Sequence, residues 1–99
     1  MQEVRYKTKK LMKECTIYSV TKTKYGERMA ALIHLRIKQI KSASSIDELL
    51  KFSIGRCHPL VGNRKGTYAM DLEHPYRLVF EKVDDEFHVV QILEIKDYH

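Results

Sequence analysis

The sequence of 99 residues has no tryptophan, only two cysteines, two prolines and four glycines, and no long apolar run. Its apolar stretches stay well short of the roughly 20 residues that a membrane-spanning helix needs. Its first ten residues, MQEVRYKTKK, contain no apolar segment of the kind found in a secretory signal. Without an export signal, we expect a cytoplasmic protein whose Cys15 and Cys57 remain reduced.

The spacings of common metal, phosphate and catalytic motifs are also missing. Cys15, Cys57 and the five histidines form neither a C-x-x-C nor an H-x-x-x-H pattern, so we expect no zinc site. The glycine-bounded turn from Gly62 to Gly66 lacks the G-x-x-x-x-G-K-[ST] spacing of a P-loop. A Ser/His/Asp signature is absent as well. The sequence therefore predicts no bound metal and no cofactor.

The sequence does have an uneven distribution of charge. Residues 1–41 hold eleven lysines and arginines against three acidic residues, whereas residues 42–99 hold seven against ten. The first segment carries about +8 and the second about −3, within a formal net charge of +5 at pH 7. Such asymmetry is typical of proteins that bind a polyanion, and nucleic acid is the first candidate. A lysine-coated helical face that serves only solubility would give the same distribution.

Periodicity divides the chain into a helical first half and a β-rich second half. The clearest helix spans residues 27–41, where apolar side chains repeat about every 3.6 residues at Met29, Ile33, Ile37 and Ile40. The other expected helices are 9–15, which Thr8 would cap, and 46–52, which Ser45 would cap. The expected strands are 67–72, 76–83 and 87–95, with an extended segment at 57–60. Residues 2–6 fit a short strand, and residues 16–24 fit a strand, a helix or a loop.

Helices followed by antiparallel strands predict an α+β domain, in which N-terminal helices pack on one face of a mainly antiparallel twisted sheet. Residues 1–99 are enough for one such domain. The opposite face of the sheet needs no cover and is free to carry polar side chains. The residues expected in the core, because each falls on an apolar stripe, are Ile33, Ile37, Leu78, Phe80 and Val89.

Arg77 is the first candidate for chemistry. Alternation along the strand 76–83 places it on the open face, where a planar guanidinium can hold a phosphate. A surface arginine paired with Glu81 or Glu94 fits the same position.

Two further groups of polar residues flank the predicted strands. His58 precedes the turn that carries Arg64 and Lys65, where glycines and cations suit an approach to phosphate. The alternative is a structural histidine beside a proline. The tripeptide Asp97-Tyr98-His99 follows the last strand and combines groups that move protons or stack on a base. The alternative interpretation of this tripeptide is a frayed chain end without a function.

Three segments, His58 to Gly66, Tyr76 to Phe80 and Glu94 to His99, together resemble the HigB-type toxins of the RelE/ParE superfamily, the plasmid-maintenance killer proteins. The stretch from Tyr25 to Ala30 and the Arg56-Cys57-His58 context resemble the same group. The resemblance covers most of the chain. It is most specific from residue 56 onward, where an H-P-L-x-G-x-R-x-G motif is followed by a D-Y-H tripeptide. It implies a RelE/ParE-like sheet with N-terminal helices packed on one side.

The resemblance also implies an activity and partners. Such toxins enter the ribosomal A site and cleave mRNA during translation, as metal-independent endoribonucleases. The cut transfers the phosphate to the neighbouring 2′-OH and leaves a 2′,3′-cyclic phosphate and a 5′-OH. A helix-turn-helix antitoxin of the HigA type neutralises the toxin, and the complex represses its own operon. The implied partners are therefore mRNA, ribosomal RNA and an antitoxin.

By matched positions, the resemblance assigns acid, base and orienting roles to His58, Asp97, Tyr98 and His99, and stabilisation of the phosphorane to Arg77. Which of the two histidines and Asp97 is acid and which is base stays open. The basic residues expected to contact RNA are Arg64, Lys65, Lys9, Lys10, Lys13, Arg28, Arg36 and Lys38. Val61 stands where the family often has a lysine, which removes one cationic contact.

Two functions without chemistry compete with the nuclease. A gyrase-poisoning toxin of the ParE branch would act by binding, but that branch generally lacks the catalytic set that His58 and the D-Y-H tripeptide represent. A degenerate RNA-binding module, or one that binds only the antitoxin, would bind RNA with a steep salt dependence and cleave nothing.

Overall fold

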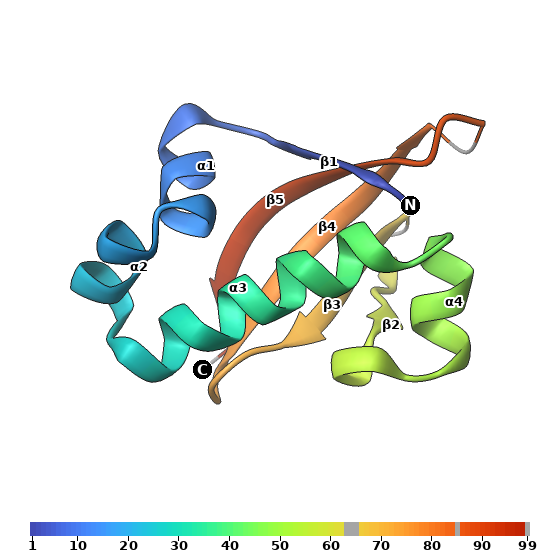
Figure 1. Ribbon diagram of the computed structural model, residues 1–99. Coiled ribbons are helices and arrows are strands. Elements are labelled where there is room, and N and C mark those ends of the chain that lie inside the picture. The colour runs from blue at the N-terminus through green and yellow to red at the C-terminus, as the bar shows by residue number, and fades with distance from the viewer. Residues whose placement is uncertain (63–65, 85, 99) are drawn as a thin grey trace.

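The structure is a computed structural model, and it describes residues 1–62, 66–84 and 86–98. Within these residues no helix is both long and apolar enough to cross a membrane. The helices of this part of the chain are α1 (Lys9–Thr16), α2 (Tyr18–Tyr25), α3 (Glu27–Ser42), α4 (Ile46–Lys51) and a short 3₁₀ helix η1 (Ile54–Arg56) (Figure 1). Its strands are β1 (Glu3–Tyr6), β2 (His58–Pro59), β3 (Thr67–Asp71), β4 (Tyr76–Asp84) and β5 (Val89–Asp97).

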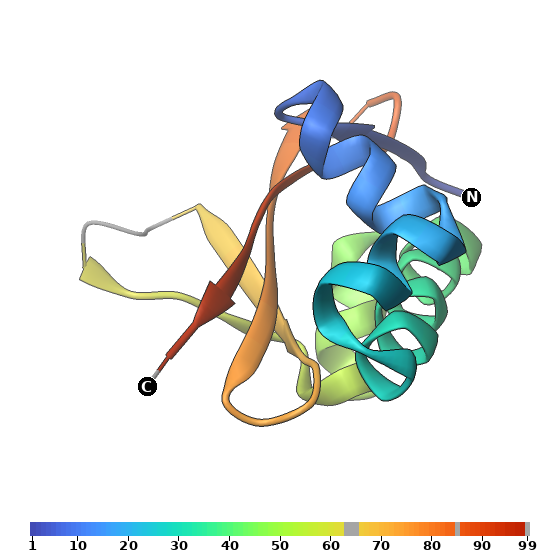
Figure 2. The ribbon, with the colours of Figure 1, turned by 90° about the vertical axis from the view of Figure 1, so that its left-hand side faces the viewer.

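The strands form one sheet in the order β1-β5-β4-β3-β2. β1 runs parallel to β5, and the other neighbours are antiparallel. The four α-helices lie on one side of this sheet, and the ends of β2 and β5 extend away from them on the other side (Figure 2). We call the side without helices the open face. The expected α+β architecture, with helices on one face of a mainly antiparallel sheet, is confirmed.

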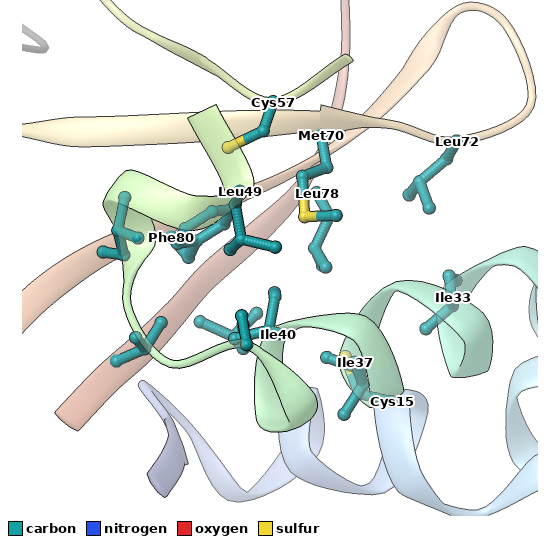
Figure 3. Packing of buried hydrophobic residues seen from close by; sticks show 14 of the residues in the cluster. Cys15, Ile33, Ile37, Ile40, Leu49, Cys57, Met70, Leu72, Leu78 and Phe80 are labelled. Carbon is teal, nitrogen blue, oxygen red and sulfur yellow. The ribbon is translucent and has the colours of Figure 1, made fainter. Parts of the chain in front are cut away.

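The core lies between α3, α4 and the covered face of the sheet (Figure 3). Ile33, Leu78 and Phe80 have no exposed surface, and Ile37 and Val89 retain only 5%. All five expected core residues are therefore confirmed. The apolar stripe of α3 is buried because it faces the alternate residues of β4, so the helical and the strand periods agree on one interior.

Both expected N-caps are confirmed. The Thr8 hydroxyl accepts from the Leu11 N–H at 3.0 Å, and the Ser45 hydroxyl accepts from the Glu48 N–H at 3.3 Å. The Glu48 carboxylate accepts from the backbone and hydroxyl of Ser44 instead of Ser45, so only half of the expected capping box forms. These hydrogen bonds to Ser44 lower the pKa of Glu48.

Residues 16–24, which the sequence left open, mostly form α2. Thr21 is fully buried, and its hydroxyl donates to the carbonyls of Ile17, at 3.0 Å, and Glu14. The Glu14 carboxylate also accepts from Lys24 Nζ at 2.7 Å. Packing and these contacts override the strand-like alternation of the segment, as tertiary context often does.

The N-terminal segment is fixed between the helices and the sheet. Glu3–Tyr6 forms a strand in register with residues 89–92 of β5. The buried Gln2 donates its backbone N–H to the Lys41 carbonyl at 3.0 Å and its side-chain amide to the Ile40 carbonyl at 2.9 Å. These carbonyls belong to the last turn of α3 and have no partner within the helix, so Gln2 closes its C-terminal end.

Candidate functional site

A row of cross-strand neighbours crosses the open face. His58 on β2 is opposite Ala69, Ala69 is opposite Val79, and Val79 is opposite Glu94 on β5. Residues directly opposite each other in antiparallel strands share a face. Ala69 and Val79 are fully buried, so the open face has a small apolar floor between its polar groups.

Arg77 lies beside this floor, in the neighbouring row. It is opposite Asp71 on one side and Lys96 on the other. Its Nε lies 3.6 Å from Asp71 Oδ1, and its guanidinium carbon lies 4.8 Å from the centre of the Tyr98 ring. The sequence suggested Glu81 or Glu94 as a pairing partner, and the structure adds the carboxylate of Asp71, which the sequence did not suggest. Asp71 and Tyr98 therefore hold the guanidinium from two sides.

A second arginine meets the same carboxylate. Arg56 Nε lies 3.3 Å from Asp71 Oδ2, so Asp71 lies between Arg56 and Arg77. Two hollows border this pair of arginines and both are lined by them. One, of about 320 Å³, also includes His58 and Cys57, and the other, of about 280 Å³, also includes Asp71, His74 and Tyr98.

His58 has a defined orientation at the edge of the first hollow. Its Nδ1 lies 2.8 Å from the backbone carbonyl oxygen of Arg56. A carbonyl oxygen only accepts, so Nδ1 carries the hydrogen in this contact. In the neutral ring the lone pair is therefore on Nε2, which is the nitrogen that can exchange a proton with a substrate.

The end of β5 is held in the sheet and does not fray within the described residues. Asp97 is opposite Tyr76, and the Tyr98 N–H donates to the Pro75 carbonyl at 3.1 Å. Tyr76 contacts Tyr25 of α2, so the register places Asp97 on the helix side of the sheet. Tyr98, one residue on, meets Arg77 on the open face.

The structure thus brings Arg77 together with Tyr98 and sets His58 beside the hollow that Arg77 lines. Asp97 was expected beside Arg77, but its register with Tyr76 puts it on the helix side of the sheet, opposite the open face. His99, Arg64 and Lys65 lie outside the described residues. The sequence analysis did not identify Asp71 as part of the site. It named Arg56 only as part of the resemblance and assigned it no role in the site. The available signal was positional, because Asp71 precedes the turn before β4 and so falls opposite Arg77.

Cys57 lines the first hollow, but its thiol is not a nucleophile. Its side chain is buried, and burial raises the pKa of the thiol to about 12. Burial, with a smaller effect of the nearby Glu14, likewise raises the pKa of Cys15 to about 12. Both cysteines are free, and both stay protonated near neutral pH.

The basic residues of α1 and α3 that were expected to contact RNA belong to helices on the other side of the sheet from Arg77. They are Lys9, Lys10 and Lys13 on α1, and Arg28, Arg36 and Lys38 on α3. Arg36 differs from the others, because its Nε donates to the Asp71 carbonyl at 2.7 Å and its Nη1 to Gln39 Oε1 at 3.0 Å. Arg36 therefore joins α3 to β3, and burial lowers its pKa.

Gly55 brings η1 against Arg36. Its φ is +58°, and a Cβ built there would lie 2.8 Å from Arg36 Nε. Only glycine combines this left-handed backbone with so close an approach at little cost. The contact connects Arg36 and Asp71 with the segment that carries Arg56.

We expect Gly55→Ala to destabilise the protein more than Gly62→Ala. Both glycines have left-handed φ values, +58° and +69°, but nothing lies within 4 Å of a Cβ at Gly62. Each substitution brings a backbone cost of about 1–2 kcal/mol. Only Gly55→Ala also displaces Arg36 from the Asp71 carbonyl, which adds about 1 kcal/mol. Urea unfolding measures the difference, and equal losses would show that the Arg36 contact adds nothing.

Comparisons with solved structures identify the fold. The chain superimposes on the YoeB/ParE toxin from Agrobacterium tumefaciens with a TM-score of 0.66 and 14% identity, over 99% of this chain and 100% of that one. The YoeB–YefM complex from Staphylococcus aureus matches with a TM-score of 0.65 and 20% identity, over 100% and 99%. YafQ from E. coli matches with a TM-score of 0.58 and 16% identity, over 99% and 94%.

No protein-family model matches the sequence, and no curated protein matches it significantly. The structural likeness extends over almost the whole of each chain at low sequence identity. The chain therefore shares the fold of these toxin structures, as expected from the RelE/ParE-like sheet that the sequence resemblance implied.

Proposed function

We propose that this chain is the toxin of a type II toxin–antitoxin system, of the HigB type, and that it is a ribosome-dependent endoribonuclease that cleaves mRNA in the cytoplasm. One observation carries this proposal. Arg77 is held by Asp71 and Tyr98 on the open face, beside a hollow that His58 also lines. A fixed cation next to a group that exchanges protons is what cleavage of a phosphodiester requires.

The proposed reaction is an attack of the ribose 2′-OH on the adjacent phosphorus. The bond from O2′ to phosphorus forms while the bond from phosphorus to O5′ breaks, which leaves a 2′,3′-cyclic phosphate and a 5′-OH. A base takes the proton of the 2′-OH, and an acid gives a proton to O5′. No external water or metal ion enters this balance of atoms.

The residues divide these tasks. His58 offers Nε2 for proton exchange, because Nδ1 is used by the Arg56 carbonyl. Arg77 stabilises the negative charge of the phosphorane, and Tyr98 orients Arg77 through its ring. Asp97 lies on the helix side of the sheet, where it pairs with Tyr76 and so helps to hold the end of β5 that carries Tyr98. His99 is the proposed second group for proton transfer, and Arg64 and Lys65 are the proposed contacts with flanking phosphates.

The helix side of the sheet fits the remaining partners. Its lysines and arginines are suited to ribosomal RNA, since contacts with phosphate need exposed cations. Two similar structures from Staphylococcus aureus and Mycobacterium tuberculosis are toxin–antitoxin complexes, which supports an antitoxin as the protein partner. We assign that partner to the helix-turn-helix, HigA-like class.

The test is cleavage of mRNA on programmed ribosomes by the wild type and by Arg77→Gln. Loss of one preorganised cation at the phosphorane is expected to lower the rate about 10²–10³-fold. Arg5→Gln is the matched control. Arg5 also pairs with a carboxylate, that of Glu3, but it lies on the edge strand β1, which β5 separates from the strand of Arg77.

Two results would contradict the proposal. One is cleavage by Arg77→Gln at the rate of the Arg5→Gln control. The other is a wild type that cleaves no ribosome-bound mRNA but inhibits supercoiling by gyrase, which would assign the chain to the gyrase-poisoning branch.

A further inference from the structure

Arg56 has no part in the catalytic set described above, yet it lies at the centre of the site. Its Nε is 3.3 Å from Asp71 Oδ2, while Arg77 approaches Asp71 Oδ1. Both hollows on this part of the open face are lined by Arg56 and Arg77. The two arginines are therefore shared by two neighbouring hollows, each of which offers a place for a nucleotide.

The backbone that carries Arg56 is built to place it there. Ser53, Gly55 and Arg56 all have left-handed φ values, of 49°, 58° and 55°. Left-handed residues other than glycine are costly and persist where the surroundings fix them. Backbone hydrogen bonds hold this turn, from the Ser53 N–H to Leu50 and from the Arg56 N–H to Ser53. Arg36 fills the space beside Gly55 and donates to the Asp71 carbonyl at 2.7 Å, so it packs the turn against β3.

The pair between Arg56 and Asp71 is easily exchanged for another anion. The Arg56 side chain is 81% exposed, whereas that of Asp71 is 29% exposed. An exposed ion pair of this kind contributes little to stability, because water competes for both charges. A phosphodiester offers two non-bridging oxygens, which the planar guanidinium can contact at the same time, whereas Arg56 now shares the Asp71 carboxylate with Arg77.

We propose that Arg56 is a second RNA phosphate-binding residue, and that the Asp71 carboxylate holds Arg56 and Arg77 in place until the phosphates of a single-stranded RNA replace it. Asp71 is then a positioning residue and a competitor of RNA. This inference rests on the proposed function, because it adds a contact to the same substrate at the same site.

Binding is measured by fluorescence anisotropy with a 2′-O-methyl RNA oligonucleotide, which lacks the attacking hydroxyl and is not cleaved. Arg56→Gln is expected to weaken binding about 10-fold and to reduce the slope of log K against log salt by about 0.7, the value for one contact on a single strand. Arg5→Gln serves as the control and keeps the wild-type affinity and slope, because Arg5 lies on β1, at the opposite edge of the sheet from β2.

Asp71→Asn is the second variant, and it moves binding in the opposite direction. It leaves the Asp71 carbonyl to Arg36, and the amide oxygen can still accept from one of the two guanidinium groups, but it removes the competing negative charge. We expect RNA to bind about three-fold more tightly, as the repulsion of one charge at close range implies. A purely structural role for Asp71 would instead weaken binding.

Equal binding by Arg56→Gln and the wild type, or no binding by the wild type, would overturn the inference. Its failure is separable from that of the nuclease. Binding that depends on Arg56 without cleavage of ribosome-bound mRNA would refute only the proposed reaction. Cleavage with unchanged binding in Arg56→Gln would refute only the role of Arg56.

Discussion

Replacing His58 by asparagine is expected to slow cleavage of ribosome-bound mRNA by about 10²–10⁴-fold, the usual contribution of one acid or base. The asparagine amide lies close to the place of Nδ1 and can still donate to the Arg56 carbonyl, which His58 contacts at 2.8 Å. It has no counterpart of Nε2. The variant therefore removes the nitrogen that exchanges protons and keeps the contact that positions the segment. The measurement is the single-turnover rate of cleavage.

The control for this prediction is His88→Asn. His88 is exposed, precedes β5 at the end remote from Arg77, and has a φ of 53°, which asparagine tolerates. We expect wild-type cleavage from this variant. If His58→Asn also cleaves at the wild-type rate while His58→Ala does not, the hydrogen bond of His58 to the Arg56 carbonyl supports the site and the side chain does no proton transfer.

Phe80→Ala is expected to lower the free energy of unfolding by about 3–5 kcal/mol. Phe80 has no exposed surface, its ring stacks on Tyr68 at 5.9 Å between centres, and it is opposite both Tyr68 and Ile92 in the sheet. Loss of the ring leaves a cavity in the middle of the core. The melting temperature should fall by more than about 12 °C for a chain of this size.

Phe87→Ala is the matched control. Its ring is 70% exposed in the turn before β5, and the backbone N–H that binds Asp84 is kept. A change within about 0.5 kcal/mol is expected at such a surface position. A melting temperature near that of the wild type for Phe80→Ala would mean that the two faces of β4 are assigned the wrong way round.

The parts of the fold that depend on local pattern could be predicted from the sequence. The stripe of α3, the caps Thr8 and Ser45 and the faces of β4 follow from spacing over a few residues, and the structure confirms them. Residues 16–24 were ambiguous because hydroxyl and β-branched side chains weaken a helical pattern. Thr21 is fully buried when residues 18–25 form a helix, and this burial favours the helix over a strand. Burial of this kind depends on tertiary packing, which a local sequence pattern does not show.

The candidate site was predictable to the extent that it depends on alternation. Alternation places Arg77 on the open face. It also puts Asp97 and Tyr98 on opposite faces of the sheet, although they are neighbours in the sequence. Asp71 and Arg56 enter the site through strand register and through the left-handed turn at Gly55. Neither feature has a local sequence signal strong enough to place a side chain.

The parallel pairing of β1 with β5 sets the order in which this protein is completed during synthesis. Glu3 is opposite Val89, so β1 pairs with a strand that is made more than eighty residues later. Contacts this distant in sequence slow folding, because a long loop must close before they form. Until residues 89–97 emerge, Arg77 has no Tyr98 and β4 has no neighbour on one side. The arrangement of Arg77 on which the proposed cleavage depends therefore forms only after Tyr98 has been made.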